Sequence, residues 1–128
     1  MSVKSNSKRN IFVVDPDKDF CESVRLYLED SYNVNSRQGL EYVDYTILLK
    51  KIDLLLIDAD YVSQNLIGVL SDVRKKHNNL KIIIMYTYFA SNKKDEVLLA
   101  KAADDMIAKP FDVQILKEKL ESLLLLTV

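Results

Sequence analysis

Apolar residues along this chain gather in short continuous runs. Five such runs recur: Ile11–Val14, a weaker one around Val34, Leu54–Ile57, Ile82–Met85 and Met106–Ala108. Continuous apolar runs of this length are typical of strands that are buried on both faces of a parallel sheet. The pattern therefore predicts five parallel strands.

The segments between and after these runs have helical spacing, with apolar positions every three or four residues. The clearest sets are Phe20, Val24 and Leu28; Leu40, Val43 and Ile47; Leu66, Val69, Leu70 and Val73; and Val113, Leu116, Leu120 and Leu123. The spacing is weaker over 91–101, and Asp112 is placed to cap the last helix. Strand and helix thus alternate five times without a break in composition. This predicts one α/β domain, a (βα)5 unit with right-handed crossovers and helices on both faces of the sheet.

The composition of the 128-residue chain removes several kinds of site. Cys21 and His77 are the single residues of their types, so neither a disulfide framework nor a Cys/His zinc site can form. The two glycines, Gly39 and Gly68, lie too far apart for a glycine-rich phosphate loop. The remaining chemistry is that of carboxylates, hydroxyls and lysines.

The chain ends and the net charge limit location and partners. We expect residues 1–8 to form a disordered basic tail and residues 9–128 to form the domain. The sequence has no secretory signal pattern and no apolar stretch long enough for a bilayer, which favours a cytoplasmic protein without membrane contact. A formal net charge of −1 gives no general attraction to nucleic acid.

Polar residues follow four of the predicted strands directly. They are Asp15, Asp58, Thr87 and Lys109. The carboxyl ends of parallel strands meet at one edge of the sheet, where ligands of such folds bind, so these four side chains are expected in one shallow cleft. Two carboxylates, a hydroxyl and an ammonium suit phosphoryl transfer to a carboxylate, with a divalent cation held by oxygen ligands.

Four segments carry a resemblance to a known family. They are Val13–Asp15, Asp53–Asp58, Ile83–Thr87 and Ala103–Phe111, of which the last is the most specific. Over residues 9–126 the sequence resembles the receiver domain of two-component response regulators, of the chemotaxis-regulator type. The resemblance implies a flavodoxin-like, doubly wound (βα)5 fold with a five-stranded parallel sheet in the order 2-1-3-4-5. It also implies a cis peptide between Lys109 and Pro110.

The resemblance implies a role for each residue at the strand ends. Asp58 is the expected phosphoacceptor, phosphorylated by a sensor histidine kinase or a phosphotransfer protein. Thr87 is the expected switch hydroxyl, and Lys109 the expected ion-pair partner of the phosphoryl group. Such a module signals without being an enzyme in its own right.

The resemblance also implies a Mg²⁺ site beside the acceptor. Its expected ligands are Asp15, Asp58 and the backbone carbonyl of Asp60. Where the family has a second acid this chain has Pro16, so we expect weaker Mg²⁺ binding. The next acid, Asp17, is a further candidate ligand, with capping of the first helix as its alternative role.

Three other positions depart from the family pattern. Tyr61 follows the acceptor where the family has Met, and Met106 replaces the aromatic residue that moves with the switch hydroxyl. Tyr88 stands where the family has a small residue, so we expect it to crowd access by phosphodonors.

Phosphorylation at Asp58 is expected to act on the face formed by Ser91–Leu120, which would bind a downstream protein or a second copy of the chain. One alternative is an unphosphorylated receiver-like module, in which Lys109 pairs directly with Asp58 in place of the metal. The other is a small phosphohydrolase of the haloacid-dehalogenase type, with Asp58 as nucleophile and Asp60 as general acid/base.

Overall fold

The computed structural model describes residues 8–87 and 93–125. Its elements, in chain order, are β1 (Arg9–Val14), α1 (Lys18–Leu28), β2 (Tyr32–Arg37), α2 (Val43–Leu49), β3 (Leu54–Asp58), the 3-10 helix η2 (Ala59–Gln64), α3 (Leu66–Lys76), β4 (Lys81–Tyr86), α4 (Lys93–Ala102), β5 (Asp105–Ala108) and α5 (Val113–Leu125). The predicted tail lies outside the described residues except for Lys8. All five predicted strands are present.

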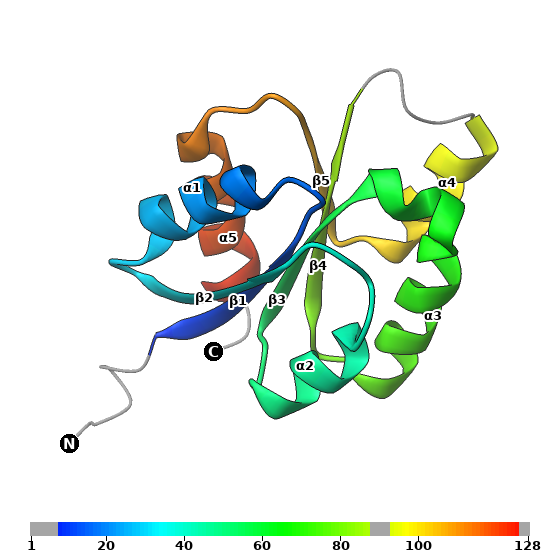
Figure 1. The fold of residues 1–128 in the computed structure, drawn as a ribbon, viewed down its shortest axis with the longest axis horizontal. Helices are drawn as coiled ribbons and strands as arrows, with labels where there is room; N and C mark the ends of the chain where they lie inside the picture. The colour runs from blue at the N-terminus through cyan, green and yellow to red at the C-terminus, as the bar shows by residue number, and fades with distance from the viewer. Residues whose placement is uncertain (1–7, 88–92, 126–128) are drawn as a thin grey trace.

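The five strands form one parallel sheet in the order β2-β1-β3-β4-β5. Helices α1 and α5 cover one face, and α2, α3 and α4 cover the other (Figure 1). The predicted fold class and strand order are therefore confirmed. Within the described residues, no helix combines the length and apolarity that a membrane crossing requires.

The core lies on both sides of the central strands. The side chains of Ile11–Val14, Leu54–Ile57 and Ile82–Met85 are fully buried, alternating between the two helical layers. Full burial of one such side chain stabilises the fold by about 1.5–3 kcal/mol. This explains why the strands appear in the sequence as continuous apolar runs.

The second helix differs from its predicted spacing. It begins at Val43, because Tyr42 adopts φ 61°, a left-handed conformation that a right-handed helix cannot contain. Leu40 therefore packs against the core from the preceding loop. The predicted cap of the last helix is present, since the Asp112 carboxylate accepts a hydrogen bond from the Gln114 N–H at 2.8 Å.

Candidate functional site

Strand register brings the polar strand ends together. Val14 pairs with Ile57, so the next residues, Asp15 and Asp58, lie side by side at the carboxyl edge of the sheet. Tyr86 pairs with Ala108, which places Thr87 beside Lys109. The convergence expected from the sequence therefore follows from the register of four strands.

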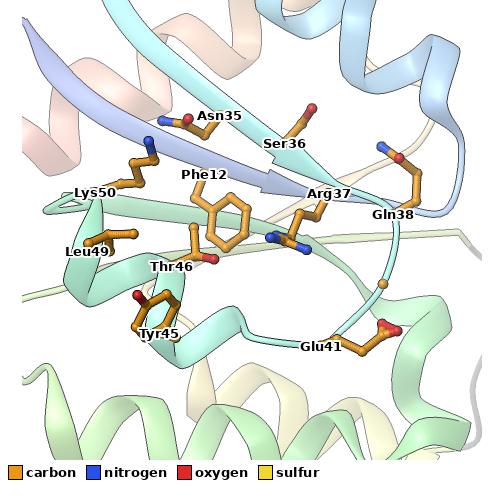
Figure 2. A pocket seen from close by; sticks show the side chains of 11 residues that line it. Phe12, Asn35, Ser36, Arg37, Gln38, Glu41, Tyr45, Thr46, Leu49 and Lys50 are labelled. Atoms are coloured by element: carbon orange, nitrogen blue, oxygen red, sulfur yellow. The ribbon is translucent and has the colours of Figure 1, made fainter.

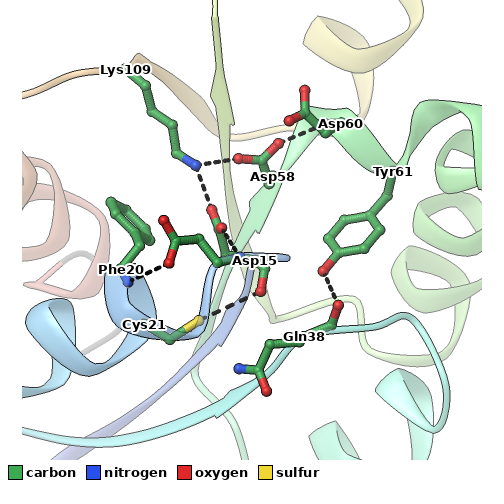
Figure 3. A network of polar contacts seen from close by, with 9 residues as sticks. Asp15, Phe20, Cys21, Gln38, Asp58, Asp60, Tyr61 and Lys109 are labelled. Carbon is green, nitrogen blue, oxygen red and sulfur yellow. Dashed lines mark hydrogen bonds and ion pairs between the residues drawn. The ribbon is translucent and has the colours of Figure 1, made fainter.

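The centre of this edge is a cluster of two carboxylates and one ammonium (Figure 3). Asp15 and Asp58 are 1% and 2% exposed. The Lys109 ammonium donates to Asp15 Oδ2 at 2.5 Å and also to Asp58 Oδ2. One cation thus neutralises one of two buried negative charges, and the cluster keeps a formal charge of −1.

The other two carboxylate oxygens accept hydrogen bonds from the backbone. The Asp17 N–H donates to Asp15 Oδ1 at 2.9 Å, and the Asp60 N–H donates to Asp58 Oδ1 at 2.7 Å. Every side-chain oxygen of Asp15 and Asp58 therefore has a hydrogen-bond donor. The Asp58 oxygen that faces Lys109 is the one whose donor belongs to a side chain and not to the backbone.

Burial and pairing shift the pKa values in opposite senses. Burial raises the pKa of Asp15, although the Lys109 ammonium opposes that shift. Burial disfavours the charged form of Lys109, but hydrogen bonds to the two carboxylates outweigh it and raise the pKa of this lysine. Burial, together with the charge of Asp58, raises the pKa of Asp60.

Two aromatic rings hold the lysine in place. The Lys109 ammonium lies 4.4 Å from the centre of the Phe20 ring, a cation–π contact. Phe20 in turn meets Phe111 edge to face at 5.9 Å. The sequence pattern assigned Phe20 to helix packing only, and the peptide between Lys109 and Pro110 is cis, as expected.

Thr87 directly follows β4 and is half-buried. Within the described residues, no hydrogen bond joins Thr87 to Asp58 or Lys109, so its switch role stays a prediction. Met106 packs against the core on the α3 side of the sheet. Tyr88, expected to crowd the cleft, lies outside the described residues.

Asp17 caps the first helix, which is the second of the two roles expected for it. Its side chain accepts a hydrogen bond from the Phe20 N–H at 3.1 Å and caps the N-terminus of α1. In that position one of its oxygens is committed to the helix. The structure therefore supports capping as the role of Asp17.

The donor set fits a hard cation such as Mg²⁺ at two carboxylates, those of Asp15 and Asp58. Pro16 adds no side-chain donor, and the Lys109 ammonium already lies against both carboxylates. Within the described residues, no group of three or more His, Cys, Asp or Glu side chains is placed to hold a metal. The third expected ligand, the Asp60 carbonyl, stays a prediction.

Tyr61 joins the segment that follows Asp58 to the loop that follows β2. The sequence analysis did not predict this contact. Its side chain is 3% exposed, and its hydroxyl donates to the Gln38 carbonyl at 2.6 Å (Figure 3). The preceding carbonyl, that of Arg37, accepts a hydrogen bond from the Asp15 N–H at 3.1 Å. The only sequence signal was that Tyr61 departs from the family pattern.

Comparison with known proteins gives a single family. A model of the response regulator receiver domain matches residues 11–121. No curated protein matches.

Solved structures that share the fold include several response regulators. One from Thermotoga maritima has a TM-score of 0.78 at 24% identity, covering 91% of this chain and 98% of its own. A two-component response regulator from Clostridium difficile has a TM-score of 0.78 at 23% identity, covering 91% and 96%. A receiver domain protein from Clostridium thermocellum has a TM-score of 0.75 at 19% identity, covering 90% and 93%. At these identities the structures establish the fold alone. The family that the chain matches does not favour a phosphohydrolase.

Proposed function

This chain belongs to the response regulator receiver domain family, and from that premise we propose that Asp58 is its phosphoacceptor. The observation that carries the proposal is the buried Asp58 carboxylate at the end of β3, with one oxygen facing the Lys109 ammonium. Aspartate carboxylates act as nucleophiles toward phosphoryl groups. The donor is a sensor histidine kinase or a phosphotransfer protein.

We propose Oδ2 as the reacting oxygen of Asp58. Its donor is the side-chain ammonium of Lys109, which can move to the incoming phosphoryl group, whereas the donor to Oδ1 is the backbone N–H of Asp60. Oδ2 attacks phosphorus, and the new P–O bond forms as the P–N bond to the donor histidine breaks. The Lys109 ammonium transfers from Oδ2 to a phosphoryl oxygen while it keeps its bond to Asp15. Thr87, beside Lys109 in the register, donates a hydrogen bond from its hydroxyl to a second phosphoryl oxygen.

When bound, Mg²⁺ supplies positive charge to the phosphoryl oxygens. Asp15, Asp58 and the Asp60 carbonyl are the residues that would hold it. Because Pro16 contributes no carboxylate and Asp17 caps α1, we propose that binding is weaker than in a site with three carboxylates. Asp15 retains a second task here, which is to hold Lys109 next to the acceptor.

The signal passes to the face formed by Ser91–Leu120, of which the described part begins at Lys93. Phosphorylation adds a charge of about −2 next to Thr87 and Lys109. Both residues adjoin the segments that lead into α4 and α5, so a shift in either changes that face. We propose a downstream protein or a second copy of the chain as its partner.

Treatment with acetyl phosphate and Mg²⁺ tests the proposal. Phos-tag electrophoresis and intact mass are expected to show one added phosphoryl group on the unmodified sequence, and none on Asp58→Asn. The matched control is Asp60→Asn, which removes a carboxylate two residues away and is expected to leave the modification in place. A parallel reaction with EDTA measures how far the transfer depends on the metal.

Two results would contradict the proposal. If neither acetyl phosphate nor phosphoramidate modifies the protein, the unphosphorylated interaction module becomes the better account, with Lys109 permanently paired to Asp58. If the protein instead releases phosphate over many turnovers and Asp60→Asn abolishes that release, the phosphohydrolase alternative is favoured.

A further inference from the structure

A pocket of about 440 Å³ lies between the edge strand β2 and helix α2. Its volume is within the usual range for small-molecule sites, about 300–1,000 Å³. Its lining among the described residues does not include Asp15, Asp58 or Lys109. The pocket is therefore separate from the cluster of Asp15, Asp58 and Lys109, called the acceptor cluster below.

Strand β2 gives the pocket a polar wall. Tyr32 and Val34 pack with the core on the α1 and α5 side. Asn35 and Arg37 point to the opposite face, where the register sets Asn35 beside Phe12. A strand covered by helices on both faces carries apolar residues on both, so these polar residues mark a part of the sheet that α2 leaves uncovered.

Helix α2 gives the other wall. Its core side consists of Val43 and Ile47, which are buried. Its pocket side consists of Tyr45, Thr46 and Leu49, and Lys50 follows directly at the C-terminal cap of the helix. Tyr45 and Leu49 are 60% and 58% exposed, so the core does not account for these apolar side chains.

The charges in the lining favour an anion. Arg37 and Lys50 are cations, and neither forms an ion pair in the described part of the chain. The Arg37 guanidinium lies 5.9 Å from the centre of the Tyr42 ring, and Figure 2 shows it directed into the pocket next to Phe12. Glu41 supplies one opposing carboxylate, so the lining has a formal charge of +1.

We propose that this pocket binds a small organic anion that carries a flat apolar ring. Arg37 holds the acidic group, since a guanidinium fork binds phosphonate, phosphate or carboxylate oxygens in pairs. Lys50, on the other side of Phe12, adds positive charge to the lining. The ring packs against Tyr45 and Leu49. Glu41 opposes binding through charge repulsion.

Titration of the ¹⁵N-labelled protein with phenylphosphonate tests this proposal by NMR. The P–C bond of this probe prevents phosphoryl transfer to Asp58. We expect saturable shifts at the amides of Arg37, Tyr45 and Lys50, with a Kd of about 1 mM. Methylphosphonate, which lacks the ring, and benzyl alcohol, which lacks the charge, are each expected to bind about tenfold more weakly.

Exposed-residue variants locate the site. Arg37→Gln is expected to raise the Kd about tenfold, because it removes a charge-assisted hydrogen bond. Lys50→Gln is expected to raise the Kd by a smaller factor, because it removes positive charge from the lining without removing that bond. Glu41→Gln is expected to lower it. Lys75→Gln, which removes an exposed charge on α3, is the matched control and leaves the Kd unchanged.

Asp58→Asn is likewise expected to leave the Kd unchanged, which separates this pocket from the acceptor cluster. Retained signal dispersion in each spectrum shows that the variants fold. The proposal is overturned if the shifts do not saturate by about 10 mM, if they centre on Asp58 and Lys109, or if Arg37→Gln and Lys75→Gln weaken binding equally.

Discussion

Lys109 is the residue on which the charge balance of the acceptor cluster depends. It faces two carboxylates that are almost fully buried, and it is the cation that contacts both. Removing one partner from a buried ion pair leaves an uncompensated charge, which costs about 3–5 kcal/mol. Removing one of the two carboxylate charges is expected to stabilise the fold, because one carboxylate and one ammonium then remain as a neutral pair.

Lys109→Met is therefore expected to lower the free energy of unfolding by about 3 kcal/mol at neutral pH. Asp15→Asn is expected to raise it by about 1 kcal/mol, because burial already disfavours the charged form of Asp15. Urea unfolding in the presence of EDTA measures both. Equal stability of Lys109→Met and the unmodified protein would show that the lysine does not neutralise the cluster.

Tyr61 carries a second residue-scale prediction, which concerns alkaline pH. Burial raises the pKa of Tyr61 above its usual 10.0, so the folded protein keeps the hydroxyl proton at a pH where the unfolded chain releases it. The stabilisation from the neutral hydroxyl is therefore present below pH 10 and declines as the pH rises above it. Its hydrogen bond to Gln38 is worth about 1 kcal/mol.

Tyr61→Phe removes the hydroxyl and keeps the buried ring. At pH 8 its free energy of unfolding is expected to be about 1 kcal/mol lower than that of the unmodified protein. At a pH above 10 this difference shrinks, because only the chain with the hydroxyl has a proton to lose. Urea unfolding at the two pH values measures the change, and a difference that stays constant would contradict the assignment.

At the scale of elements, the start of α1 separates a structural role of Asp17 from a metal-binding one. The Asp17 side chain caps the helix, and removal of such a cap costs about 1 kcal/mol. The free energy of unfolding of Asp17→Ala is therefore expected to fall by about 1 kcal/mol. Asp17→Ser keeps a capping oxygen, so its stability is expected to stay close to that of the unmodified protein. Thermal unfolding distinguishes the two variants.

The same pair of variants tests metal binding. Calorimetric titration with Mg²⁺ is expected to give the same affinity for Asp17→Ser as for the unmodified protein, since the Asp17 side chain is engaged at the N-terminus of α1. A marked loss of affinity in Asp17→Ser would assign the carboxylate to the metal instead.

At the scale of the whole molecule, Arg74 connects three segments that are distant in the sequence. Its guanidinium donates to the carbonyls of Leu80 and Ala102 and to Asp104 Oδ2. The same Asp104 oxygen accepts a hydrogen bond from the Ile82 N–H at 2.8 Å. One side chain thus links α3 to the start of β4 and to the end of α4. Helix α4 belongs to the face formed by Ser91–Leu120, which is the proposed partner-binding surface.

Arg74→Met is expected to loosen α4 selectively. Hydrogen exchange measured by mass spectrometry should become faster in 93–102 and stay unchanged in α1, with a global loss of about 1 kcal/mol because the guanidinium is partly exposed. Lys75→Met on the same helix is the control. Uniformly faster exchange across the molecule would contradict a local role for Arg74.

The apolar runs and helical spacings determined the fold class of this chain without reference to its structure. Burial on both faces of a strand leaves a local mark, a continuous run such as Leu54–Ile57, which can be read one segment at a time. The polar residues at the strand ends were equally visible, because each directly follows such a run. Asp15, Asp58, Thr87 and Lys109 could therefore be named from the sequence.

Only the tertiary structure decided which side chains from distant segments contact one another. The bridge from Lys109 to two carboxylates and the hydrogen bond from Tyr61 to Gln38 both join segments that are far apart in the sequence. The pocket beside β2 also depends on where a short helix leaves the sheet uncovered. Local periodicity records which face of an element is buried, but it does not record which atom on a distant element meets that face.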